Sequence, residues 1–141
     1  MADPVAHAGC LVDSNVILDI ATEDETWFDW SAAALADQAR VGTLFVNPIV
    51  YAEVSLNYDR IEDLDTALPE SLFTRAALPY QAGFLAARAF ASYRASRGSR
   101  RSPLPDFYIG AHAAVGGLHL LTRDARRYRT YFPTVRLITP S

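Results

Sequence analysis

The chain has 141 residues, half of them hydrophobic, which suits one globular domain with an ordinary buried core. The formal net charge is only -3, but residues 1–74 hold 14 acids and two arginines, whereas residues 75–141 hold 11 arginines and two acids. This balance argues against indiscriminate nucleic-acid binding and favours contact with a polyanion through the C-terminal half.

The sequence also excludes several other protein classes. Cys10 is the single cysteine, so the chain has no internal disulfide or cysteine zinc site, and we expect a reduced, buried thiol. The start "MADPVAHAGCL" has no basic region followed by a long apolar one, so it does not resemble a signal peptide. The apolar stretch 107–121 is too short to span a bilayer. We therefore expect a cytoplasmic protein, with residues 1–141 forming one domain and no membrane segment.

The N-terminal part predicts a strand followed by two helices. "GCLVD", residues 9–13, is typical of a short buried strand that ends at Asp13. The helix that follows begins near Ser14 or Asn15, either of which is a suitable cap. A second helix is expected over residues 27–41, ending near a glycine.

The next part predicts a second strand and two further helices. The strand is expected over residues 43–46. Asn47 and Pro48 are the residue types preferred at the N-cap and first position of a helix, so a helix should begin there. A short acidic helix over residues 61–68 and an extended segment over 72–78 follow.

The C-terminal half predicts a long helix over residues 80–97 and a loop with two prolines over 98–105. Asp106 then stands where it would cap a helix over residues 107–116. The remaining expected elements are a strand at 118–122, a helical turn at 123–128 and a last strand at 135–139. Short apolar strands that alternate with helices predict an α/β fold, a three-layer α/β/α sandwich with a central parallel sheet.

Four acids are expected near the carboxyl ends of the strands, where open parallel sheets bind ligands. They are Asp13, Glu53, Asp106 and Asp124. Glu53 shares a helical stripe with Ile49 and Leu56, so it interrupts an apolar face. Each acid also has a simpler explanation: a turn or helix cap for the three aspartates, and a half-exposed helix position for Glu53.

Taken together, the acids indicate a cation site. Carboxylates crowded into one pocket repel one another unless a cation is present. Mg²⁺ and Mn²⁺ prefer oxygen ligands, keep several waters and use substrate phosphate as a further ligand. Such a site would activate water for attack on a phosphodiester.

Four segments of the chain resemble the acidic motifs of PIN-domain ribonucleases of the VapC-like toxin branch. They are "LVDSNVILDI", "NPIVYAEVSL", "LPDFYIGAHAAV" and "LLTRDARRY", and they occur in the family order between residues 10 and 138. The resemblance implies a PIN-like fold with Asp13, Glu53, Asp106 and Asp124 as catalytic, metal-binding residues. Asn15 and Thr122 match the polar residues that orient these acids.

The resemblance also implies an activity and partners. The expected activity is that of an endoribonuclease that depends on Mg²⁺ or Mn²⁺ and acts as the toxin of a type II toxin–antitoxin pair. The expected partners are an RNA substrate, a second copy of the chain in a homodimer, and a cognate antitoxin whose C-terminal segment covers the active site.

Arginines beside the last two acids are candidates for holding an RNA backbone. The candidates are Arg97, Arg100, Arg101, Arg123 and Arg126. Any one of them is equally typical of a solvated surface. Three aromatic residues, Tyr93, Phe107 and Tyr108, are better explained as core than as base-stacking residues. His112 lies about 240° around the helix from Asp106, so we expect it in the core rather than in a catalytic role.

Two other functions fit parts of the pattern. A non-catalytic PIN-like module that binds RNA or protein would typically lack one or more of the four acids, and none is missing here. A phosphatase with an Asp-x-Asp motif would need an acid at position 15, where this chain has Asn15.

Overall fold

The computed structural model describes residues 9–97 and 104–140. Five parallel strands form one sheet in the order β3-β2-β1-β4-β5. The strands are β1 (Cys10–Val12), β2 (Leu44–Val46), β3 (Phe73–Arg75), β4 (His119–Leu121) and β5 (Leu137–Ile138). The helices are α1 (Ser14–Ala21), α2 (Phe28–Val41), α3 (Pro48–Ser55), α4 (Ile61–Ala67), α5 (Tyr80–Arg97), α6 (Leu104–Gly116) and α7 (Arg126–Tyr131).

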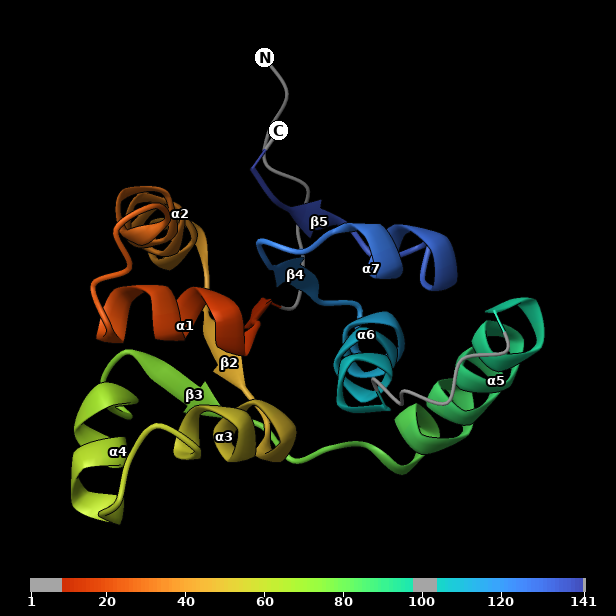
Figure 1. Cartoon of the computed structure of the whole chain (residues 1–141), viewed down its shortest axis with the longest axis horizontal. Coiled ribbons are helices and arrows are strands. Elements are labelled where there is room, and N and C mark those ends of the chain that lie inside the picture. The colour runs from red at the N-terminus through yellow and green to blue at the C-terminus, as the bar shows by residue number, and fades with distance from the viewer. Residues whose placement is uncertain (1–8, 98–103, 141) are drawn as a thin grey trace.

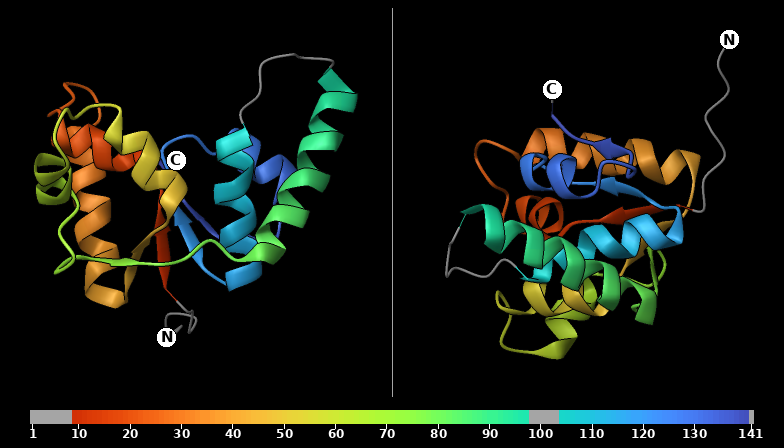
Figure 2. Two further views of the ribbon diagram at one scale, coloured as in Figure 1. Left: turned by 90° about the horizontal axis from the view of Figure 1, so that it is seen from below. Right: turned by 90° about the vertical axis from the view of Figure 1, so that its right-hand side faces the viewer.

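Helices cover the sheet on both faces, as the predicted α/β/α sandwich requires. Figure 1 shows α1 and α2 on one side of the strands and α6 and α7 on the other. Helix α5 packs against α6, farther from the sheet, and the two turned views show the same arrangement (Figure 2). Helices α3 and α4 lie beside the β2–β3 end of the sheet (Figure 1). Since every strand pair is parallel, all strand carboxyl ends lie along one edge.

The strands at the centre of the sheet are largely buried. All three residues of β1 are buried, and Cys10 pairs with Leu44 of β2 and His119 of β4. Burial raises the pKa of the Cys10 thiol to about 12, which agrees with the expected reduced thiol. A strand buried on both faces has to be apolar throughout, which is why continuous apolar runs identified the strands correctly.

The start of α3 follows the prediction from its sequence. Asn47 adopts an extended backbone conformation and its side chain accepts a hydrogen bond from the Val50 N–H, while Pro48 occupies the first turn. The cap satisfies a backbone donor that the helix itself cannot pair. Asn47 is also held by a contact of 3.0 Å between its Nδ2 and His112 Nδ1 on α6, so the cap joins two helices.

Three local predictions were wrong. Helix α6 begins at Leu104, so Asp106 lies inside the first turn instead of capping it. Pro105 explains this, because proline is well tolerated in a first helical turn. Helix α1 is capped by Asp13 itself, through a hydrogen bond from the Ser14 N–H, and not by Ser14 or Asn15. The helical turn expected at 123–128 is α7, which begins three residues later.

Across residues 9–97 and 104–140, no helix combines the length and the apolar character needed to cross a membrane.

Candidate active site

Asp13 is the most buried acid at the carboxyl edge of the sheet, with 3% of its surface exposed. Its Oδ1 accepts hydrogen bonds from the Ser14 N–H at 2.7 Å and the Ser14 hydroxyl at 3.4 Å. Its Oδ2 accepts from the Thr122 hydroxyl at 2.8 Å and the Tyr128 hydroxyl at 3.0 Å. Burial raises the pKa of Asp13, and these donors oppose the rise because they stabilise the ionised form.

Ser14 joins the first acid to the second. Its hydroxyl donates to Glu53 Oε1 at 2.8 Å, a much shorter contact than the one to Asp13. A serine hydroxyl has one proton, so the Glu53 bond takes it and leaves Asp13 Oδ1 with room for a further partner. The pKa of Glu53 is raised by partial burial, and the neighbouring Asp13 carboxylate raises it further.

Glu53 reaches this site for a different reason from the one predicted. The buried side of α3 carries Val50 and Val54, whereas Leu56 is 87% exposed. The apolar stripe expected through Ile49, Glu53 and Leu56 is therefore wrong. Glu53 lies at the border between the buried and exposed sides of the helix, which lets its carboxylate face Ser14 while staying partly in solvent.

Asp106 lies beside both the positively charged guanidinium of Arg127 and the other acids of the site. Its Oδ2 lies 2.6 Å from Nη1 of Arg127, and the side chains are 30% and 28% exposed. The pKa of Asp106 is raised to about 6, first by burial and then by the Asp13 carboxylate, with Glu53 and Asp124 adding to the rise and Arg127 opposing it. Asp13, Glu53 and Asp124 are thus all close enough to Asp106 for their charges to act on its carboxyl.

The two polar residues predicted to orient the acids lie just beyond the carboxyl ends of β1 and β4. Thr122 is completely buried, donates to Asp13 and accepts a hydrogen bond from the Asp124 N–H at 3.1 Å. Asn15 Nδ2 donates to the Thr122 hydroxyl at 3.3 Å, and Asn15 Oδ1 accepts from the Arg123 N–H at 3.2 Å. Thr122 therefore positions Asp13 directly, and Asn15 acts on the acids through Thr122.

The donor set suits a hard divalent cation in its chemistry. All four side chains offer carboxylate oxygens, and their mutual repulsion is what a bound cation would relieve. Within the described residues, no three acidic, histidine or cysteine side chains converge into a preformed metal-binding group. Mg²⁺ needs only one or two carboxylates besides water and substrate phosphate, so this arrangement is compatible with such an ion.

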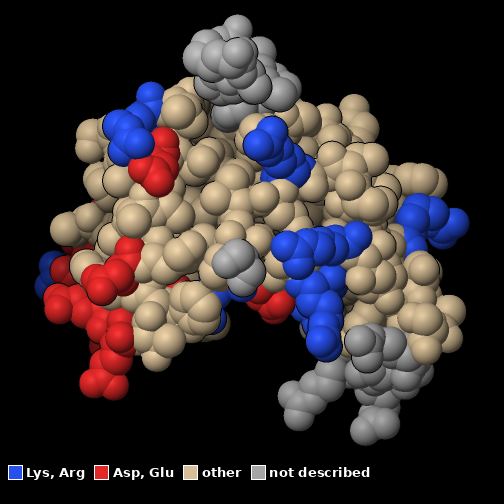
Figure 3. Space-filling view, turned by 90° about the horizontal axis from the view of Figure 1, so that it is seen from above, with Lys and Arg blue, Asp and Glu red and all other residues tan. Residues whose placement is uncertain are grey.

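The predicted RNA-binding arginines differ in their surroundings. Arg123 makes a bidentate contact with the buried Asp19, from Nε at 2.7 Å and Nη2 at 2.8 Å, and its guanidinium carbon lies 5.2 Å from the centre of the Trp27 ring. Arg126 is exposed on α7. The Arg97 side chain, Arg100 and Arg101 lie outside the described residues. Figure 3 shows most acids on the left of the face that it draws and most arginines in the middle and on the right, with acidic atoms beside the arginines near the centre.

The aromatic and histidine predictions are confirmed by burial. Phe107 and Tyr93 belong to the core, where their ring centres lie 5.4 Å apart, and Tyr108 packs partly buried against it. His112 is 4% exposed and contacts Asn47, and burial lowers its pKa. Gly110 leaves room for the Phe132 ring, which lies where a Cβ atom would be.

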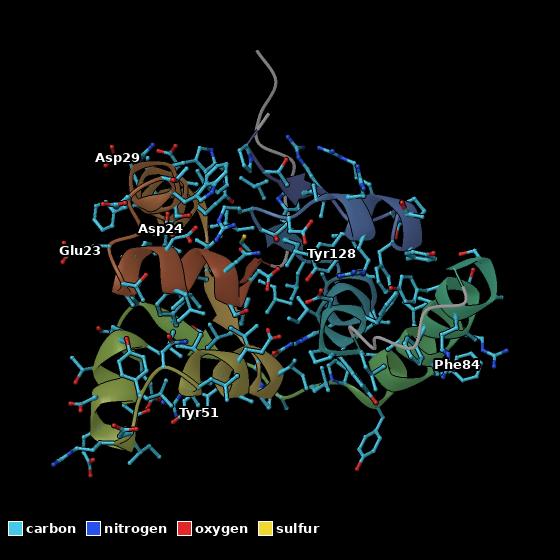
Figure 4. All side chains as sticks on the ribbon, in the orientation of Figure 1. Glu23, Asp24, Asp29, Tyr51, Phe84 and Tyr128 are labelled. Atoms are coloured by element: carbon cyan, nitrogen blue, oxygen red, sulfur yellow. The ribbon has the colours of Figure 1, made fainter. Side chains whose placement is uncertain are left out.

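Sequence reasoning missed three residues that touch the acids. Ser14 bridges Asp13 and Glu53, Tyr128 donates to Asp13, and Arg127 pairs with Asp106. Figure 4 shows Tyr128 on the side of α7 that faces the middle of the molecule. Tyr128 and Arg127 lie in "LLTRDARRY", one of the four acidic motifs, but only the packing of α7 shows which of its side chains turn inward.

Comparison with known proteins places the chain in a family. The PIN domain model matches residues 10–133. No curated protein sequence matches the chain. It is similar in structure to VapBC2 from Rickettsia felis bound to a promoter DNA fragment, at 16% identity and TM-score 0.69, covering 92% of this chain and 97% of that one. It is also similar to a toxin–antitoxin complex from Klebsiella pneumoniae, at 19% identity and TM-score 0.66, covering 94% and 98%. Such low identities show a shared fold, and the family model spans most of the sequence, so the chain belongs to the PIN domain family.

Proposed function

We propose that this chain is an endoribonuclease that depends on Mg²⁺ or Mn²⁺ and acts as the toxin of a type II toxin–antitoxin pair. The observation that carries the proposal is the group of acids at the carboxyl edge of the sheet, where Asp13, Glu53 and Asp124 each raise the pKa of Asp106. Neighbouring carboxylates disfavour one another's ionised form, and a bound cation would offset this repulsion.

The acids have different parts in the proposed site. Asp13 is held by donors from α1, α7 and the residue after β4, so its orientation is fixed before any ligand binds. Asp13 and Asp106 would hold the metal, with Glu53 and Asp124 as further ligands directly or through water. When bound, the metal would activate water and stabilise the leaving oxygen of a phosphodiester.

RNA as the substrate is supported by the charge pattern. The arginine-rich half of the chain supplies Asp106, Asp124 and the exposed Arg126, so the acids border a basic surface. Such a surface attracts a phosphate backbone, and the acids alone would repel it. The toxin role is supported by the toxin–antitoxin complexes that share the fold.

The test is cleavage of single-stranded and structured RNA by the purified chain. We expect cleavage with Mn²⁺, none with EDTA and none by Asp106→Asn with Mn²⁺. Asp29→Asn is the matched control, because Asp29 is an exposed acid of α2 that lies far from Tyr128 in Figure 4. Cleavage by Asp106→Asn that survives EDTA would overturn the assignment of the acids.

The toxin role needs a separate test in cells. Expression of the chain should arrest growth, and Asp106→Asn should not. Co-expression of the protein encoded beside it should relieve the arrest and yield a complex on co-purification. Normal growth during strong expression of an RNA-cleaving protein would separate the activity from the toxin role.

A further inference from the structure

Arg127 occupies a position beside the acids that the proposed metal chemistry leaves unexplained. Its Nη1 atom lies 2.6 Å from Asp106 Oδ2, and its guanidinium carbon lies 5.6 Å from the centre of the Tyr93 ring and 6.0 Å from that of Phe107. The guanidinium is therefore held between a carboxylate and two aromatic rings of the core. Arg127 is therefore part of the site and not a freely solvated surface arginine.

Arg127 also supplies charge where the acids lack it. Its guanidinium forms an ion pair with the Asp106 carboxylate, and both side chains are only partly exposed. Arg123, four residues earlier, is engaged by Asp19 instead. Arg127 thus does for Asp106 what a bound divalent cation would do.

Arg127 also lines a pocket of about 460 Å³. It is lined by Tyr93, Asp124, Arg126, Arg127, Thr130 and Tyr131. Its volume is in the range of small-molecule sites, and its two arginines and hydroxyl groups match the oxygens of a phosphate. Arg127 therefore borders both the acids and a basic pocket.

We propose that Arg127 is the counter-ion of Asp106 in the metal-free protein and that it competes with a divalent cation for this carboxylate. When the cation is bound, the guanidinium of Arg127 is released and holds a phosphate of the RNA backbone in the pocket between α5 and α7. This inference rests on the proposed function. It assigns Arg127 as a positioning residue whose partner changes from a carboxylate to a phosphate when the metal binds.

The first test measures Mn²⁺ affinity by electron paramagnetic resonance, without RNA. Arg127→Gln should bind Mn²⁺ about tenfold more tightly than the parent chain, because a competing positive charge has been removed. Arg127→Lys keeps the charge and should bind nearly as the parent does. Arg126→Gln, next along the same helix and with an exposed side chain, is the matched control and should change the affinity by much less.

Circular dichroism melts confirm that each variant is folded. Equal or weaker Mn²⁺ binding by folded Arg127→Gln, with binding by the parent intact, would overturn the inference and leave the proposed nuclease standing. Absence of Mn²⁺ binding by the parent and all variants would instead reject the metal-dependent function, and the inference with it. Tighter binding by Arg127→Lys as well would attribute the effect to packing and reject charge competition.

The second test measures binding of a 2′-O-methyl RNA, which resists cleavage, with and without Mn²⁺. In the parent chain Mn²⁺ should strengthen RNA binding, both through the metal and through the released guanidinium. Arg127→Gln should lose most of this gain although it binds the metal more tightly. A gain as large in Arg127→Gln as in the parent would contradict the assignment of the phosphate to Arg127.

Discussion

Asp106 offers a test of the electrostatic reasoning that needs no RNA: replacing it with asparagine should stabilise the metal-free protein at alkaline pH. The pKa of this carboxyl is raised from 3.8 to about 6, because burial and the charges of Asp13, Glu53 and Asp124 outweigh the opposing charge of Arg127. An ionised Asp106 therefore costs the native state free energy, and asparagine has no charge to bury.

The size and the pH range of the effect follow from linkage. A raised pKa means that the native state holds the proton more tightly than the unfolded chain does. The carboxyl is protonated in both states below about pH 4, and stability is then lost as pH rises through about 6. The full difference corresponds to about 3 kcal/mol. The side chain is 30% exposed, so we reduce the expected gain for Asp106→Asn to about 1–2 kcal/mol at pH 8.

The assay is urea unfolding in EDTA at five pH values between 4 and 8. Asp106→Asn should match the parent near pH 4 and exceed its free energy of unfolding increasingly towards pH 8. Asp29→Asn, at an exposed position, should follow the parent throughout. Saturating Mn²⁺ should stabilise the parent more than Asp106→Asn and narrow or reverse the difference. A pH-independent difference, or an Asp106→Asn protein less stable at pH 8, would refute the reasoning.

Packing and a buried ion pair give two further predictions. Gly110→Ala should lower the free energy of unfolding by about 1–3 kcal/mol, because the added methyl overlaps the Phe132 ring. Gly83→Ala should raise it by about 0.5–1 kcal/mol, because the added Cβ meets nothing closer than 3.9 Å and alanine favours a helix more than glycine does. Equal shifts in melting temperature for the two variants would contradict this prediction. Arg123→Gln should lower the free energy of unfolding by about 2–3 kcal/mol, because it leaves the charge of the buried Asp19 unpaired. The double variant Arg123→Gln, Asp19→Asn should recover part of this loss in urea unfolding. Additive losses from the two substitutions would contradict a stabilising ion pair.

The fold was largely predictable because its signals are local. Buried strands must be apolar throughout, and Asn47 followed by Pro48 determines a helix start from adjacent residues. The errors arose where two local signals competed. Asp106 is a good cap, but Pro105 suits a first helical turn equally well, and α6 begins before both.

The acids were predictable for the same reason, whereas their partners were not. A parallel sheet brings the ends of β1, β2 and β4 to one edge, so their sequence positions were enough to group Asp13, Glu53 and Asp124. Tyr128 contacts Asp13, which lies 115 positions earlier in the sequence, and Arg127 contacts Asp106, which lies 21 positions earlier. Their contacts depend on the orientation of a six-residue helix, which no short-range pattern specifies.

Asp13 and Asp106 differ in how easily a ligand could replace the groups that hydrogen-bond to their carboxylates. Asp13 is buried, and its donors are a backbone N–H and hydroxyls from residues that are themselves buried or partly buried, so exchanging them would disturb the core. Asp106 is partly exposed, and its partner is a guanidinium that lines an adjoining pocket. A ligand that enters from solvent can therefore replace the partner of Asp106 at little structural cost, while Asp13 keeps its geometry. This asymmetry would make the proposed metal site rigid at Asp13, where the cation is positioned, and open at Asp106, where it enters.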